Sequence, residues 1–208
     1  GRRPRRGGLH RGPVPRRLQD RAPMRRPSRA ALSLFALLLA LAPPLAGAAS
    51  FSPELERLLD LVEHRARLMP DVARWKWHAG RPVTDPARER QVLEAATRTA
   101  AAAGLEANGA RAFVAAQMRV SRAIQTRAFE DFARAAPAPD GPDLQRDLRP
   151  AISATTTAVL EVLPRVLPLL PEAVAPVRAD LRRRLVPVGA DAASIDALAD
   201  ALLALRPD

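Results

Sequence analysis

The sequence predicts an all-α protein, and three observations support this fold class. The chain of 208 residues is 48% hydrophobic but only 3% aromatic. From residue 49 onward it is rich in Ala, Leu, Arg and Glu, which favour helices, and it lacks the alternating runs of Val, Ile, Thr or Tyr that indicate strands. Four stretches repeat apolar residues with helical spacing, and capping or turn residues separate them.

The first two predicted helices have clear boundary residues. The first covers residues 53–77, and we expect Pro70 to kink it or to begin a new turn. The second begins at Pro86, directly after the capping residue Asp85, which is a favoured arrangement for a helix start. It ends at Gly104, a residue type common at helix C-termini.

The second half of the chain contains two further long helical stretches. The third predicted helix covers residues 106–135, and the Pro- and Gly-rich linker 136–143 follows it. The fourth begins near Asp143 and extends at least to Leu163. Four prolines then interrupt an apolar stretch, which leaves the continuity of helix open there. A short helix over residues 192–205 closes the chain.

The basic excess of the chain lies almost entirely in its first 48 residues. The formal net charge is +11. Residues 1–48 hold eleven arginines and one acid, whereas residues 49–208 hold 22 basic and 21 acidic residues, a net charge of +1. A nearly neutral body does not have the charge pattern of a nucleic-acid-binding protein. We therefore expect no nucleic-acid partner.

Residues 24–48 have the pattern of a secretory signal peptide. Three arginines follow Met24, an apolar run of 13 residues covers positions 30–42, and small residues precede a cleavage point after Ala48. The run is shorter than the ~20 residues that a membrane-spanning helix needs. We expect cleavage near Ala48 and a periplasmic or secreted product with no membrane partner.

This pattern predicts the domain organisation. Residues 1–23 are expected to be an upstream extension or a translation artefact. Residues 49–208 are expected to form one domain, with the motifs described below in 53–152 and a proline-interrupted helical region in 153–208. The chain has no cysteine, so an exported form must be held together by its core without disulfides.

Two basic residues of the first predicted helix fall on one face. Arg65 and Lys76 are separated by 11 residues, which returns to within about 20° of the same direction on an α-helix and about 16 Å along a straight one. Lys76 is the only lysine among 33 basic residues. An ammonium is a compact point charge, whereas a guanidinium is a planar fork. Lys76 is therefore a candidate for a functional site that needs a compact positive charge.

Polar residues also recur at fixed spacing in the next two helices. Arg88 and Glu89 lie in the first turn of the second helix, where free amide groups add partial positive charge. Gln117, Ser121 and Gln125 follow an i, i+4, i+8 pattern in the third. Each residue alone is most simply a surface residue, because polar stripes usually face solvent.

Together these residues belong to three sequence motifs that resemble those of a known protein family. The motifs are R-x-x-L-M-x-D-V-A-x-x-K-W from Arg65, D-P-x-R-E-x-x-V-L from Asp85, and Q-x-x-x-S-x-x-x-Q from Gln117. At these spacings they resemble the all-α chorismate mutases, in particular their exported, periplasmic branch. The resemblance covers residues 53–152 and implies a helical bundle that converts chorismate to prephenate.

The resemblance implies a set of substrate-binding residues. Arg65, Arg88 and Arg149 would bind the two carboxylates of chorismate, and Ser121 would contact one of them. Arg146 lies three residues before Arg149 and is the alternative for that position.

The resemblance also implies which groups act at the reacting atoms. Lys76 and Gln125 would hydrogen-bond the ether oxygen of the breaking C–O bond. Glu89 would accept a hydrogen bond from the ring hydroxyl, with backbone help at Asp85. The expected catalytic set is thus Lys76, Gln125, Arg88 and Glu89. No metal site and no cofactor are expected, and a homodimer is expected because helical relatives commonly dimerise.

Two other functions remain open at the sequence level. Isochorismate-pyruvate lyases share the scaffold and a similar cationic pocket, although the first two motifs look more like those of the exported mutases. A non-catalytic helical module that binds acidic ligands is the other alternative. Such a binder needs cations for carboxylates but has no use for ether-oxygen donors at positions 76 and 125.

Overall fold

The computed structural model describes residues 51–208. The predicted upstream extension, the signal peptide and its cleavage point lie outside the described residues. Within residues 51–208 the chain is helical, and its only β feature is an isolated bridge between Leu105 and Pro207. The predicted all-α class is confirmed.

The first predicted helix is two helices. Helix α2 (Pro53–Arg67) ends before Leu68, and helix α3 (Met69–His78) begins directly after it. Pro70 lies in the first turn of α3, where the missing N–H costs no intrahelical bond. The alternative that Pro70 begins a new turn is therefore confirmed, and Arg65 and Lys76 lie on two consecutive helices.

The next two helices agree with the predicted boundaries to within two residues. Helix α4 (Pro86–Ala102) is capped by Asp85, whose Oδ1 accepts a hydrogen bond from the Arg88 amide at 3.0 Å. After α4 the chain turns at Gly104, whose φ of +70° favours glycine. Helix α5 (Ala107–Arg134) has 28 residues and is about 42 Å long.

The C-terminal half contains more helix than its prolines suggest. In addition to the predicted fourth and last helices, it forms a helix between them that the sequence left open. Its elements are η1 (Leu144–Leu148, π-helical), α6 (Arg149–Val166), η2 (Leu167–Glu172, 3₁₀), α7 (Val174–Leu185), η3 (Val186–Val188, 3₁₀) and α8 (Ala192–Leu203). Pro176 lies in the first turn of α7, where proline is tolerated.

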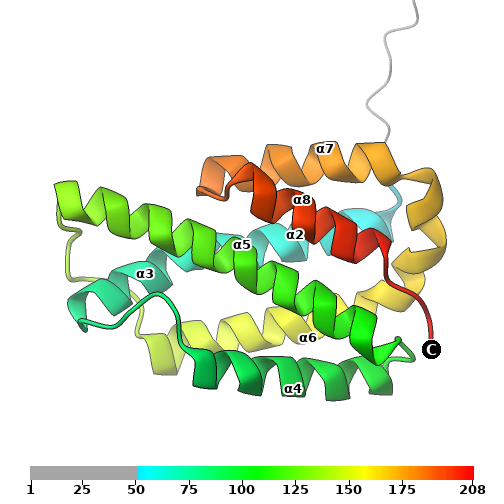
Figure 1. The fold of residues 1–208 in the computed structure, drawn as a ribbon, viewed down its shortest axis with the longest axis horizontal. Coiled ribbons are helices and arrows are strands. Elements are labelled where there is room, and N and C mark those ends of the chain that lie inside the picture. The colour runs from blue at the N-terminus through cyan, green and yellow to red at the C-terminus, as the bar shows by residue number, and fades with distance from the viewer. Residues whose placement is uncertain (1–50) are drawn as a thin grey trace, which may run out of the picture. The chain divides into compact units, whose positions relative to one another are not determined.

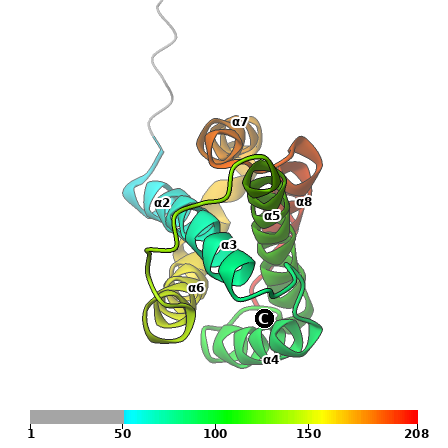
Figure 2. The same ribbon diagram turned by 90° about the vertical axis from the view of Figure 1, so that its left-hand side faces the viewer.

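Helix α5 is the common neighbour in this arrangement. It contacts α2, α3, α4 and α8, while α6 packs against α2 and α4. Helix α7 lies against α2 and α8 (Figures 1 and 2). The segments that carry the three sequence motifs therefore surround one region between α3, α4, α5 and α6.

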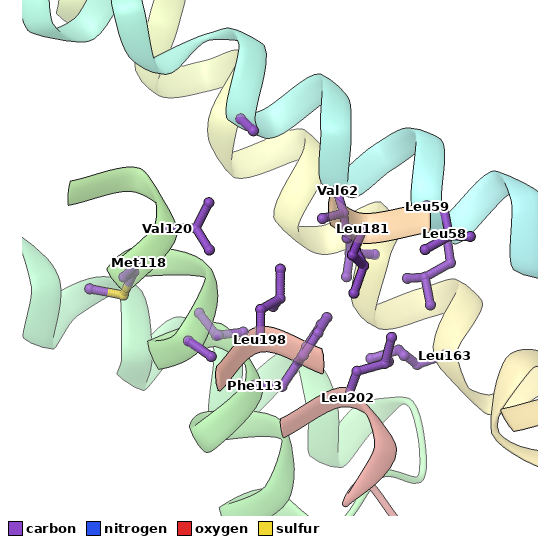
Figure 3. Packing of buried hydrophobic residues seen from close by; sticks show 14 of the residues in the cluster. Leu58, Leu59, Val62, Phe113, Met118, Val120, Leu163, Leu181, Leu198 and Leu202 are labelled. Carbon is purple, nitrogen blue, oxygen red and sulfur yellow. The ribbon is translucent and has the colours of Figure 1, made fainter. Parts of the chain in front are cut away.

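A large part of the hydrophobic core lies where α2 and α5 meet the C-terminal helices α7 and α8. Figure 3 shows Leu58 and Leu59 of α2, Phe113 of α5, and Leu181 and Leu198 from the two last helices gathered in one cluster. All five side chains are fully or almost fully buried. The C-terminal helices thus complete the core on which α2 and α5 rest.

The apolar character of α6 and η2 has a structural origin. By length and composition, the stretch Leu144–Glu172 is long and apolar enough to cross a membrane. Its side chains Val159, Leu163 and Val166 are fully buried in the core of the bundle. Packing against neighbouring helices therefore accounts for these buried apolar residues.

A buried arginine joins α7 to α2. Arg184 forms hydrogen bonds with Asp180 and Glu56, with Asp60 at 2.5 Å and with Glu63 at 3.0 Å. Burial acts to lower the pKa of Arg184, but these hydrogen bonds outweigh it and raise the pKa. The buried cation is thus paired with carboxylates, of which Asp180 and Glu63 are largely buried and Glu56 and Asp60 reach the surface, so its charge is compensated.

The same contacts act on the carboxylates. Burial acts to raise the pKa of Glu63, but hydrogen bonds from Arg67 and Arg184 outweigh it and lower the pKa from its ordinary 4.5. A lowered folded-state pKa means that the stabilisation is fully present above about pH 4.5 and is lost as pH falls through the folded-state value.

We predict that Arg184→Met lowers the free energy of unfolding by about 2–4 kcal/mol, because several carboxylates lose their shared cation. The melting temperature of the variant should also change less between pH 5 and pH 3 than that of the wild type. Urea unfolding and thermal melts measure both. Arg182→Met is the control, because Arg182 pairs with Asp196 at the surface. Equal stability of the two variants would contradict the prediction.

Candidate active site

A small cavity lies between α3, α4, α5 and α6. Its volume is about 230 Å³, which suits a ligand smaller than a typical drug molecule. Its walls include apolar side chains such as Met69, Val72 and Met118, together with five basic and two acidic residues. All eight residues predicted from the sequence line it: Arg65, Lys76, Asp85, Arg88, Glu89, Ser121, Gln125 and Arg149.

Arg65 enters the cavity from the last turn of α2 and is only 6% exposed. Its Nη1 donates to Ser121 Oγ at 2.6 Å and to the Gln117 carbonyl at 3.4 Å, and its Nε donates to Thr156 Oγ1 at 3.3 Å. Burial lowers the pKa of Arg65 to about 10. No carboxylate within residues 51–208 forms an ion pair with it, so the site contains a buried cation that lacks an anion.

Lys76 comes from the last turn of α3 and is half-buried. Its Nζ donates to the Val83 carbonyl at 2.5 Å in the loop that leads to α4. Burial lowers the pKa of Lys76, the charges of Asp85 and Glu89 oppose this, and the charge of Arg149 adds to it. The ammonium has three donors, so the contact with Val83 leaves donors for a ligand.

The N-terminus of α4 brings a cation and two acids to the cavity. The Asp85 carboxylate caps the helix through Oδ1, and its Oδ2 lies 4.0 Å from Arg149 Nη2. Arg88 Nη1 donates to Gln91 Oε1 at 3.3 Å and forms no ion pair with a described residue. Glu89 forms an ion pair with Arg122 at 2.9 Å. Three cavity cations, Arg65, Lys76 and Arg88, therefore lack an acidic partner within 4 Å among residues 51–208.

The polar stripe of α5 is buried rather than exposed. Gln125 Nε2 donates to the Ser121 carbonyl at 3.1 Å and contacts Met69 Sδ at 3.6 Å, while its Oε1 has no hydrogen-bond partner among the described residues. Gln117 is 2% exposed, and neither polar atom of its side-chain amide has a partner there. The expectation that such a stripe faces solvent is wrong, because α5 is covered on several sides.

The beginning of α6 separates the two arginine alternatives. Arg149 lines the cavity, and its Nη1 donates to Gln145 Oε1 at 2.7 Å. Arg146 is highly exposed and pairs with Asp147 at 3.0 Å. Of the two, only Arg149 is among the residues that line the cavity.

Several polar residues of the cavity were not predicted from the sequence, and two of them contact predicted ones across helices. Arg122 directly follows Ser121, and Thr156 on α6 accepts the hydrogen bond from Arg65. Arg122 is one of 32 arginines in the chain, so composition does not distinguish it. Its pairing with Glu89 joins residues 33 positions apart, and nothing local in the sequence indicates it.

The cavity has the properties of a site for a small dianion. Three cations lack acidic partners, and planar carboxylates are the usual ligands of guanidinium groups. One of the three is the Lys76 ammonium, whose remaining donors suit an uncharged oxygen on the same ligand. The neutral Gln125 amide also lines the cavity. The apolar walls suit the hydrocarbon part of such a ligand.

The comparisons with known proteins support this interpretation. Residues 56–126 match the family described as chorismate mutase type II. The chain is similar to a chorismate mutase from Burkholderia thailandensis, with 32% identity and a TM-score of 0.59 over 73% of this chain and 98% of that one. No curated protein sequence matches the chain.

Two other solved structures share the fold at lower identity. A secreted chorismate mutase from Yersinia pestis has 22% identity and a TM-score of 0.61, and a chorismate mutase from Burkholderia phymatum has 24% identity and a TM-score of 0.61. Each match covers 73% of this chain and 98% of the other. Because the match at 32% identity spans nearly the whole Burkholderia thailandensis protein, the chain belongs to the chorismate mutase type II family.

Proposed function

We propose that the chain is a chorismate mutase that rearranges chorismate to prephenate inside the cavity between α3, α4, α5 and α6. The observation that carries this proposal is the buried Arg65 guanidinium, which faces the cavity without a carboxylate partner among the described residues. A buried cation without an anion is costly, and a carboxylate of the substrate supplies that anion. Family membership supports the same reaction.

The charges of the cavity suit a dicarboxylate. Five basic and two acidic side chains line it, a formal excess of three positive charges, and a bound dianion reduces this excess to one. Arg65, Arg88 and Arg149 bind the two carboxylates, and Ser121 contacts one of them. Binding at three separate cations holds the flexible substrate in the folded conformation in which its reacting carbons meet.

The reaction itself requires stabilisation of one oxygen. The ether C–O bond breaks as the new C–C bond forms within the same molecule, and no proton is transferred. Negative charge builds on the ether oxygen, where donors that are already in place lower the barrier. Lys76 and Gln125 donate to this oxygen from α3 and α5, and Glu89 accepts from the ring hydroxyl.

The exported character of the chain is part of the proposal. Residues 24–48 act as a cleaved signal peptide, residues 1–23 are not part of the functional protein, and residues 49–208 form the periplasmic or secreted enzyme. The secreted protein of Yersinia pestis shares the fold. Mass spectrometry of the mature protein, which identifies its N-terminal residue, tests cleavage near Ala48. We also propose that the enzyme is a homodimer, which light scattering tests.

We predict that Arg65→Met raises the free energy of unfolding by about 1–3 kcal/mol, because it replaces an unpaired buried charge with an apolar chain of similar length. The same change should abolish the rise in melting temperature that chorismate causes in the wild type. Arg57→Met, at an exposed position of α2, should change neither quantity. A destabilised Arg65→Met variant that still responds to chorismate would contradict the assignment.

We predict that Lys76→Ala lowers kcat by at least the ~10²–10³-fold typical of losing one oxyanion donor. Lys76→Arg should recover little, because a planar fork does not concentrate its charge at one oxygen. The loss of chorismate, followed by ultraviolet absorbance with purified protein, measures both. If the wild type leaves chorismate unchanged, the proposed function is wrong; if Lys76→Arg retains full turnover, only the point-charge explanation is.

A separate prediction concerns pH. An amide does not titrate, so kcat/KM of the wild type should be flat from about pH 5 to 8. It should fall at alkaline pH, below the ordinary lysine value of 10.5, because burial lowers the pKa of Lys76. Gln125→Glu must be protonated to donate, so its activity should fall as pH rises through the neutral range. A wild-type profile that falls steeply above pH 6 would exclude this role for Gln125.

A further inference from the structure

Arg122 forms an ion pair with one of the proposed catalytic residues. It follows Ser121 on α5, and its Nη1 donates to Glu89 Oε2 on α4 at 2.9 Å. Both side chains line the cavity. No other cation of residues 51–208 forms a hydrogen bond or an ion pair with the Glu89 carboxylate.

The contribution of this pair to stability is small. The side chain of Arg122 is 33% exposed and that of Glu89 is 29% exposed, and ion pairs with this degree of exposure typically contribute about 0–1 kcal/mol. The two helices are already joined by apolar packing that includes Ala96 and Ala100 of α4. A role in function can therefore be separated from a role in folding.

Glu89 shares the cavity with two cations, Arg122 and Lys76. It pairs with Arg122, whereas Lys76 donates to the Val83 carbonyl. The charge of Glu89 nevertheless acts to raise the pKa of Lys76. If Glu89 moved onto Lys76, it would occupy the ammonium that the ether oxygen requires. It would also withdraw its own acceptor from the ring hydroxyl.

We propose that Arg122 is a positioning residue for the substrate's ring hydroxyl: it holds one oxygen of the Glu89 carboxylate, leaves the other oxygen free to accept from that hydroxyl, and prevents Glu89 from pairing with Lys76. This inference rests on the proposed function. Arg122 itself does not touch the reacting atoms, and its effect passes through Glu89. The monodentate contact through Oε2 is what leaves Oε1 available.

The experiment compares Arg122→Met with the wild type in steady-state kinetics with chorismate across pH. We expect kcat/KM at neutral pH to fall about tenfold, equivalent to about 1.4 kcal/mol. The alkaline limb of kcat/KM should move to higher pH by about one unit, because a carboxylate that pairs with Lys76 stabilises its charged form. The other charges that act on Lys76, those of Asp85 and Arg149, are unchanged in the variant.

Two further variants separate this role from a structural one. Arg119→Met changes an exposed arginine one turn earlier on α5 that does not line the cavity, so it should leave kcat/KM and the pH profile within about twofold of the wild type. In a Glu89→Gln background, Arg122→Met should cause no further loss and no shift of the alkaline limb. If Arg122 only joined α4 to α5, its replacement would not shift the alkaline limb of kcat/KM, either in the wild type or in the Glu89→Gln background.

The outcomes are distinguishable. A tenfold loss with a shifted limb that disappears in the Glu89→Gln background supports the inference. Unchanged kinetics, or a loss without any shift of the limb, overturns it while the proposed function stands. A wild type that does not consume chorismate overturns the proposed function and this inference with it.

Discussion

The rest of the site depends on one constraint, which is that a guanidinium is buried without a counter-ion among residues 51–208. The surrounding structure supplies Arg65 only with neutral acceptors, a hydroxyl from each of two helices and a backbone carbonyl. Hydrogen bonds of this kind orient the group but do not neutralise it. The fold therefore holds a charge that a bound anion would neutralise, and the hydrophobic core provides the stability that such an arrangement requires.

Within residues 51–208, the two most deeply buried arginines have opposite surroundings. Arg184 is surrounded by carboxylates and joins two helices. Arg65, on the helix that Arg184 joins to α7, contacts hydroxyl and carbonyl groups and faces a cavity. The difference lies in the partners and not in the burial, since both side chains are almost fully buried. The carboxylates around Arg184 fit a structural role, whereas the lack of carboxylates around Arg65 fits a role in binding an anion.

The sequence predicted the site better than it predicted the path of the chain. Residues such as Lys76, Arg88 and Gln125 were identified because local spacing and family motifs indicate them, and each lines the cavity. Helix α7 was left open because a proline is tolerated in its first turn, and composition does not reveal this position. The contact between Arg122 and Glu89 depends on how α4 packs on α5, which no local pattern encodes.

The Arg184 cluster also bears on how a cysteine-free chain keeps its last helices in place. Four carboxylates from α2 and α7 surround one guanidinium, which ties distant segments together as a covalent cross-link would. Unlike a cross-link, this tie requires no oxidant and no enzyme to form it. A chain translocated unfolded into another compartment would complete its C-terminal half as soon as the two helices meet, in reducing and oxidising surroundings alike.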